Sequence, residues 1–189
     1  MSTVQDILTF LEGFAPPELA EHWDNVGLLC GDRNQQVTAA LCALDITEQV
    51  VDEAVARGAQ LIVAHHPAIF TSVSRVTTDD ATGRVLRAAI KNDIALICMH
   101  TNADSAWGGV NDALAAALFL TNVVNMEAGD NRMLGRVGDL PREMQPREFA
   151  EYVKECLRAG GVRFCDGGHD IHRVAVGGGA CGKMMDDAL

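Results

Sequence analysis

Short apolar runs alternate with amphipathic segments along the first two thirds of the chain. Continuous apolar runs at 39–44, 61–64 and 94–99 have the length and composition of buried strands. Between them, apolar residues recur at helical spacing over 47–57 and 83–92. Strands that are apolar on both faces and separated by single helices are typical of parallel sheets with right-handed crossovers. The pattern therefore predicts an α/β fold built from strand-helix units.

The pattern changes after residue 120. Earlier in the chain, helices are predicted over 4–13 and 111–120, and a short strand follows Asp24 and Asn25. The later part predicts strands at 123–126, 134–137, 162–165 and 173–176, with a helix that begins at Pro146. These expectations place a metal-binding α/β lobe at 1–125 and a second, incomplete α/β lobe at 126–189.

Polar side chains follow three of the predicted strands at the point where each one ends. Asp45 follows the first, His65 and His66 follow the second, and His100 with Asp104 follows the third. The carboxyl ends of parallel strands share one crevice, so these groups are expected to lie close together. Neighbouring residues of a strand point to opposite faces, but Pro67 ends this strand at once. Both imidazoles can then turn towards one site, although a loop with one partly buried histidine remains an alternative.

Imidazole and carboxylate ligands together suit Zn, Mn, Fe, Co or Ni, whereas Ca and Mg prefer oxygen alone. The predicted metal ligands are His65, His66 and Asp104. Each histidine can hold its own ion while Asp104 bridges the two, which predicts two divalent ions per complete chain. Such a pair of ions suits hydrolysis by activated water.

Other polar residues near these strand ends have more than one interpretation. His100 is the candidate catalytic residue as a proton shuttle, but it could equally be a further ligand, a support for the ligands or a loop histidine. Asp24, Asn25 and Asp45 are candidates for lining the site. For Asp24 and Asn25 the alternative is ordinary turn chemistry before a strand.

Composition narrows the class of protein. The 189-residue chain carries a formal net charge of −11 and has an isoelectric point near 4.8, which disfavours nucleic acid and anionic membranes as partners and fits divalent cations. No apolar run approaches the length of a bilayer span, and the N-terminus lacks the pattern of a signal peptide. Six cysteines form no C-x-x-C pair, so we expect reduced, buried thiols in a cytoplasmic protein.

Two later motifs favour structure over chemistry. Gly177, Gly179 and Gly182 match G-x-G-x-x-G, and Gly182-Lys183 nearly completes a P-loop. Met184 stands where a P-loop needs a hydroxyl, so a structural turn between a strand and a helix is favoured. His169 and His172 are expected in an exposed turn rather than at a metal.

Four segments together resemble the Nif-three-like family, the YbgI-type group of dinuclear-metal proteins known as GTP cyclohydrolase I type 2 homologues. They are Trp23-Asp24-Asn25-Val26-Gly27-Leu28, His65-His66-Pro67, His100-Thr101-Asn102-Ala103-Asp104 and Gly109-Val110-Asn111. The resemblance implies that His65, His66 and Asp104 are metal ligands and that Asp24, Asn25 and His100 line the site. It also implies two related lobes and a homohexamer.

The C-terminal part departs from the pattern of that family. Its members carry a late Gly-His-x-x-x-Glu motif with two more ligands, and no such motif occurs here. The second lobe is therefore expected to be truncated, as a fragment or a short form with a weakened site. A metal-dependent hydrolase of a small, nucleotide-like substrate is the leading hypothesis. A non-catalytic metal-binding or metal-delivery protein and an interaction scaffold are the alternatives.

Overall fold

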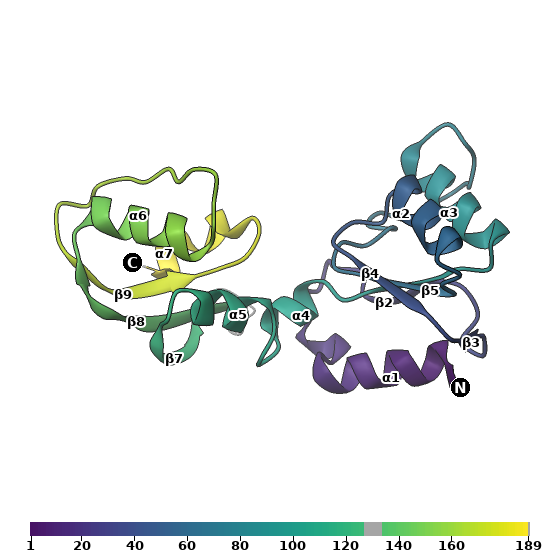
Figure 1. The fold of residues 1–189 in the computed structure, drawn as a ribbon, viewed down its shortest axis with the longest axis horizontal. Helices are drawn as coiled ribbons and strands as arrows, with labels where there is room; N and C mark the ends of the chain where they lie inside the picture. Colours follow the sequence, from purple (N-terminus) through teal and green to yellow (C-terminus); the bar gives the residue numbers. More distant parts are fainter. Residues whose placement is uncertain (127–133, 189) are drawn as a thin grey trace. The chain divides into compact units, whose positions relative to one another are not determined.

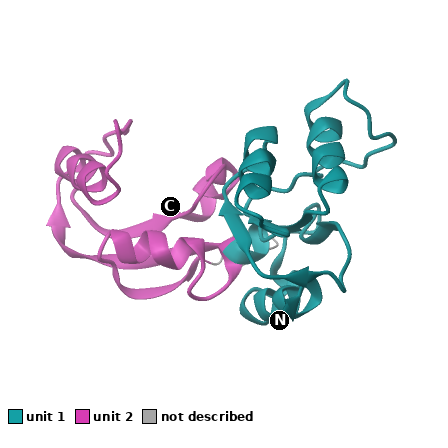
Figure 2. Ribbon diagram, turned by 45° about the vertical axis from the view of Figure 1, so that its right-hand side comes forward, with its two compact units in different colours: residues 1–103 teal, residues 104–189 magenta. Residues whose placement is uncertain are grey.

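The chain forms two compact units in the computed structural model, which describes residues 1–126 and 134–188. The first unit is Met1–Ala103 and the second is Asp104–Leu189 (Figure 2). The short helix α4 (Thr101–Ser105) carries the division. The sequence places the boundary later, at 125–126. It lies earlier here because Ala115 of the following helix and Leu118, just after that helix, join the core of the second unit.

A four-stranded sheet organises the first unit. Its spatial order is β2-β6-β5-β4, and the strands span Gly27–Cys30 (β2), Ala95–Cys98 (β6), Leu61–Ala64 (β5) and Ala40–Ala43 (β4). β4, β5 and β6 are parallel, which confirms the predicted α/β class. β2 differs in pairing antiparallel with β6 at the edge.

Helices cover both faces of this sheet (Figure 1). α2 (Glu48–Ala56) and α3 (Ala81–Lys91) lie on one face and α1 (Val4–Phe14) on the other. Each begins at a residue whose side chain accepts a backbone N–H of the first turn: Thr3, Thr47 and Asp80. Burial on both faces explains why β5 and β6 are continuous apolar runs. Two short strands, β1 (Ser2–Thr3) and β3 (Gln36–Val37), pair at the start of α1.

The second unit is built on an antiparallel sheet of order β7-β8-β9. Its elements are α5 (Val110–Ala117), β7 (Thr121–Met126), β8 (Gly135–Met144), α6 (Pro146–Cys156), β9 (Ile171–Val176), a 3-10 turn (Cys181–Met184) and α7 (Met185–Ala188). Both α5 and α6 contribute to one core with β8 and β9. The Tyr152 hydroxyl donates to the carbonyl of Leu118 at 3.0 Å and joins the two helices.

The strand predicted at 162–165 is wrong. These residues are exposed and have no regular secondary structure, so their apolar members find no neighbouring strand or core. The predicted strand at 173–176 is confirmed as part of β9. Within residues 1–126 and 134–188, every helix is too short or too polar to cross a membrane.

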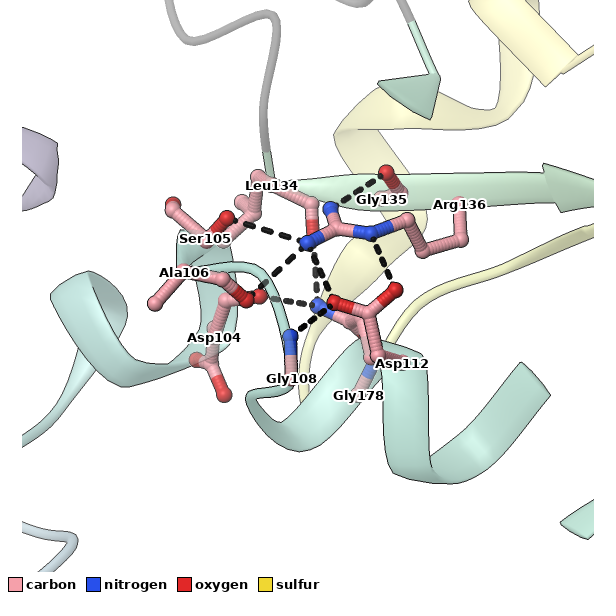
Figure 3. A network of polar contacts seen from close by, with 10 residues as sticks. Asp104, Ser105, Ala106, Gly108, Asp112, Leu134, Gly135, Arg136 and Gly178 are labelled. Carbon is pink, nitrogen blue, oxygen red and sulfur yellow. Dashed lines mark hydrogen bonds and ion pairs between the residues drawn. The ribbon is translucent and has the colours of Figure 1, made fainter. Parts of the chain in front are cut away.

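A completely buried arginine holds the second unit together (Figure 3). Two nitrogens of Arg136 donate to the two carboxylate oxygens of Asp112 at 2.9 and 2.8 Å. The nitrogen Nη2, one of these two, also contacts the backbone carbonyls of Ser105 and Ala106 at 3.1 and 3.0 Å, and Nη1 donates to the Gly135 carbonyl at 3.0 Å. The guanidinium also lies over the Trp107 ring, 4.6 Å from its centre. The planar fork of arginine suits such a bidentate, stacked position, which a lysine could not fill.

A buried asparagine joins three further segments of this unit. The Asn111 amide nitrogen donates to the carbonyls of Asp104 and Leu134, and its oxygen accepts the Gly178 N–H at 2.7 Å. The glycine-rich segment after β9 is therefore fastened to α5, and a 3-10 turn follows it. These contacts agree with the structural turn expected there.

Candidate metal centre

The register of the parallel strands brings three polar residues to one level. Ala43 pairs with Ala64, and Ala64 pairs with Cys98, so the last residues of β4, β5 and β6 form one row across the sheet. The hydrogen-bonded ladder continues beyond the strands, since the His66 N–H reaches the Leu44 carbonyl at 2.9 Å. Two residues past the row stand Asp45, His66 and His100. The chain thus brings them together from segments far apart in the sequence.

Three imidazole rings form a compact cluster at this edge. The ring centres of His65 and His66 lie 5.0 Å apart, those of His65 and His100 5.1 Å, and those of His66 and His100 5.6 Å. One nitrogen from each ring lies within 4.8 Å of the chosen nitrogens of the other two. Three neutral imidazoles at this separation can hold one transition-metal ion after small adjustments of their side chains.

Each ring of the cluster is oriented by an oxygen at its Nδ1 atom. The Nδ1 of His65 lies 3.0 Å from the Met99 carbonyl, that of His66 lies 2.7 Å from Asp45 Oδ1, and that of His100 lies 2.8 Å from Asp24 Oδ1. Carbonyl and carboxylate oxygens only accept, so we assign the proton of each neutral ring to Nδ1. Nε2 is then unprotonated, which is the form that binds a metal. Oxygen partners of this kind are typical behind metal-bound histidines.

Asp24 is the most enclosed of these supports. Its side chain is completely buried, and it accepts hydrogen bonds from His100, from the Asn25 N–H at 2.7 Å and from the hydroxyl and N–H of Thr101. Burial opposes ionisation of Asp24, but the hydrogen bonds from Thr101, His100 and Asn25 outweigh it and lower its pKa. The carboxylate therefore stays ionised and fixes the orientation of His100.

Comparison with known proteins assigns this chain to a family. The model of the Duf34/NIF3 (NGG1p interacting factor 3) family matches residues 2–189. The chain belongs to the NIF3 family. This NIF3 protein is 39% identical over 193 residues to the GTP cyclohydrolase 1 type 2 homolog of Clostridium perfringens, with 98% of this chain and 72% of that protein aligned.

Two other relatives agree. The GTP cyclohydrolase 1 type 2 homolog of Streptomyces coelicolor is 41% identical over 195 residues, covering 98% of this chain and 68% of that protein. A crystal structure of a Bacillus cereus protein related to NIF3 has a TM-score of 0.89 at 28% identity, over 99% of this chain and 79% of that one. The resemblance inferred from the four segments is thereby confirmed for the NIF3 family and for the fold.

The predicted site residues of this NIF3 protein fall into two groups. His65, His66, Asp24, Asp45 and His100 all belong to the first unit and contact one another as described. Asn25 also lies there, but its amide donates to the Ile69 carbonyl at 2.6 Å.

Asp104, the predicted carboxylate ligand, is the first residue of the second unit. It is 8% exposed, and its backbone carbonyl accepts from Asn111. Its role as a ligand stays a prediction from the sequence.

Two supporting groups of the centre escaped sequence reasoning. The Met99 carbonyl is a backbone atom, which no side-chain motif reveals. Thr101 stands inside the His100-Thr101-Asn102-Ala103-Asp104 segment, but its bond to Asp24 joins residues separated by 77 positions. The row of strand ends is the signal that could have located the Met99 carbonyl, because it lies beside His65 in the register.

Removing the support behind His66 should weaken metal binding in this NIF3 protein. An Asp45→Ala variant removes the carboxylate that lies 2.7 Å from the His66 Nδ1, so we expect metal affinity to fall about tenfold. Zinc titration against a competing chelator measures the change. Asp52→Ala, an exposed aspartate of α2, is the matched control and should bind zinc as the unaltered protein does. Equal affinity in both variants would contradict the orienting role of Asp45.

The cysteines of this NIF3 protein differ sharply in exposure. All six are free, but Cys42 and Cys165 are exposed, so the expectation that all are buried is wrong for these two. Cys98 is completely buried, and its thiol donates to the His65 carbonyl at 3.0 Å. Burial, with a smaller contribution from the charge of Asp24, raises the pKa of the Cys98 thiol to about 12.

Thiol alkylation should follow this difference. At pH 8 the Cys98 thiol is almost entirely protonated, so iodoacetamide should modify Cys42 and Cys165 and leave Cys98 intact in the folded protein. Peptide mass spectrometry before and after unfolding in guanidinium measures the labelling. Labelling of Cys98 at the rate of Cys42 in the folded protein would show that the end of β6 is open to solvent.

Proposed function

We propose that this protein binds a divalent transition metal at His65, His66 and His100 and acts as a metal-dependent hydrolase on a small-molecule substrate. The observation that carries the proposal is the shared orientation of the three rings, each held at Nδ1 by an oxygen acceptor. Zn, Mn, Fe, Co and Ni all suit neutral imidazole ligands. A bound divalent ion supplies the means to activate water and to polarise a substrate oxygen.

The protein's own residues orient the proposed ligands. Asp24 is buried and ionised, so it holds the Nδ1 proton of His100 and leaves the Nε2 of that ring available to an ion. We therefore propose that His100 completes the ligand set. The proton shuttle expected for His100 is the alternative to this role, because a ring that holds a proton at Nδ1 and an ion at Nε2 has no nitrogen left to take up another proton. The second ion and Asp104 as its bridging ligand belong to the same proposal and rest on the resemblance described above.

Metal delivery is the second candidate function. The side chain of His66 is 46% exposed, and that of its partner Asp45 is 58% exposed. A ligand so open to solvent can be exchanged for a ligand of a partner protein, which favours transfer of the metal. Turnover separates the two functions, because a delivery protein binds and transfers the ion without consuming a substrate.

Metal loading followed by an activity screen tests the proposal. The purified protein is loaded separately with Zn, Mn, Fe, Co and Ni, its metal content is measured, and hydrolysis of phosphoesters and nucleotides is followed. We expect metal uptake and turnover with at least one ion, and loss of turnover in His100→Ala but not in His22→Ala. Metal uptake without turnover under every loading, with transfer to an apo acceptor, supports delivery instead. Absence of metal uptake contradicts both functions.

We also propose a homohexamer in the cytoplasm. The hexamer follows from the family resemblance, and the six free cysteines support a reducing compartment. Light scattering coupled to size-exclusion chromatography should give six times the 20.2 kDa mass of the chain. A monomeric mass at micromolar concentration contradicts the assembly.

A further inference from the structure

Two large aromatic side chains stand exposed beside the histidine cluster. Trp23 is 50% exposed and Phe70 is 54% exposed, although each could bury a large apolar area. Their ring centres lie 5.9 Å apart at an interplanar angle of 63°. Both rings meet His100 edge-on, at 6.3 Å for Trp23 and 6.5 Å for Phe70. The pair therefore borders the proposed metal centre and offers aromatic surface to a ligand.

The polar residues of the centre also fix this aromatic pair. Asp24 and Asn25 directly follow Trp23, and Asn25 donates to the carbonyl of Ile69, the residue before Phe70. The Asp24 N–H is itself bonded to the Glu21 carbonyl at 2.9 Å, so the segment is held on both sides of Trp23. The two rings are thus positioned by hydrogen bonds of Asp24 and Asn25, and the Asp24 carboxylate also supports His100. Such preorganisation lowers the entropy cost of binding a ligand.

A groove lined in part by Phe70 adds polar groups to this aromatic surface. Its cavity volume is about 410 Å³, within the range of small-molecule sites, and it runs along the segment from Pro67 to Thr82. Its polar lining comprises one carboxylate, that of Asp80, which accepts the Gly83 N–H at 2.7 Å, and a larger group of hydrogen-bond donors: the hydroxyls of Thr71, Ser72, Ser74 and Thr82 and the guanidinium of Arg75. Hydroxyl and guanidinium donors suit phosphate oxygens.

We propose that Trp23 and Phe70 form a stacking platform for the base of a nucleotide and that Arg75 and the neighbouring hydroxyls receive its phosphate. The inference rests on the proposed function, because it places this nucleotide beside the metal-binding histidines as substrate. Stacking on aromatic side chains tolerates different bases, so the platform selects a planar heteroaromatic ring rather than one particular base. Metal binding and nucleotide binding use different side chains and can be measured separately.

Tryptophan fluorescence gives a direct reading of the platform. The chain has two tryptophans, so a Trp107→Phe variant leaves Trp23 as the only one. We expect AMP and GMP to quench its emission with saturation, adenosine to quench with weaker affinity, and ribose 5-phosphate to leave it unchanged. Quenching by ribose 5-phosphate equal to that by AMP, or no saturable quenching by any nucleotide, would overturn the stacking platform.

Matched variants separate the aromatic and the anionic parts. Calorimetry should show AMP binding about 5- to 100-fold weaker in Trp23→Leu and in Phe70→Ala. Phe10→Ala, which changes another exposed phenylalanine, on α1, should bind AMP normally. Arg75→Gln should weaken AMP but not adenosine, and Arg87→Gln on α3 should change neither. Unchanged AMP affinity in Trp23→Leu and Phe70→Ala contradicts the proposal. So does a change of oligomeric mass in these variants without a change in AMP affinity, which would assign the aromatic pair to self-association.

Metal content, measured in the same samples, distinguishes this inference from the proposed function. Nucleotide binding without metal uptake would support the stacking platform and contradict the hydrolase. Metal uptake and hydrolysis, with AMP affinity unchanged in Trp23→Leu and Phe70→Ala, would support the hydrolase and contradict the platform. Both proposals stand only if Trp23→Leu keeps its metal and loses affinity for AMP.

Discussion

An Arg136→Met variant is expected to lose about 3–5 kcal/mol of unfolding free energy in the second unit. Methionine keeps much of the apolar stem but leaves the Asp112 carboxylate and the carbonyls of Ser105, Ala106 and Gly135 without this donor. Buried acceptors that lose their partners cost more than the net value of the hydrogen bonds themselves. Urea unfolding followed by Trp107 fluorescence, in a Trp23→Phe background, reports on this unit alone.

The neighbouring strand provides a matched control. Arg173 of β9 also donates to a single aspartate, Asp139, at 2.8 Å, but its side chain is 55% exposed. Arg173→Met should therefore change stability by no more than about 1 kcal/mol. An Arg136→Met/Asp112→Leu double variant should recover part of the loss, because it removes the buried carboxylate as well. Equal losses in Arg136→Met and Arg173→Met would show that burial of the guanidinium contributes little.

Replacing one histidine of the cluster is expected to have the largest effect on metal binding. His66→Ala removes a proposed ligand, so its cost should exceed the 10- to 100-fold that loss of an outer hydrogen-bond partner produces. We expect zinc affinity to fall at least about 100-fold, with the thermal stability of the metal-free protein nearly unchanged because the His66 side chain is 46% exposed. Zinc titration against a chelator and thermal unfolding without metal measure the two effects.

The other histidines of the chain serve as controls for that experiment. His22 is exposed in the first unit, and His169 and His172 are exposed in the second. His22→Ala and His172→Ala should both bind zinc as the unaltered protein does. A loss in these variants comparable with that in His66→Ala would indicate scattered surface binding rather than one centre.

The strand pattern carried enough information to predict the convergence of Asp45, His66 and His100. Apolar runs and amphipathic helices define parallel strands, and parallel strands place their carboxyl ends together. The same reasoning could not find β2 as an antiparallel edge, because a four-residue apolar run does not reveal its direction. It also predicted a strand at 162–165, where no partner strand is present to pair with it in the described structure.

Long-range polar pairs were beyond the reach of the sequence. Arg136 and Asp112 are separated by 24 positions and carry no motif. Only the folded second unit shows that they form an ion pair in which Arg136 is buried. The exposed pair of Trp23 and Phe70 was equally hidden, since a pattern of apolar residues predicts burial and not a solvent-facing aromatic surface. Burial and strand register are properties of the whole fold, so they cannot be predicted well from single residues.

Because the last residues of β4, β5 and β6 form one row, the arrangement of the site is sensitive to insertions within these strands. One residue added within β5 would shift every later side chain by one position, turning His66 away from Asp45 and moving a different side chain opposite His100. A substitution of one apolar residue for another in these strands leaves that alignment in place. The turn at 32–34 lies outside these three strands and can absorb an insertion without disturbing them. Strand length, more than the identity of the strand residues, is what this centre depends on.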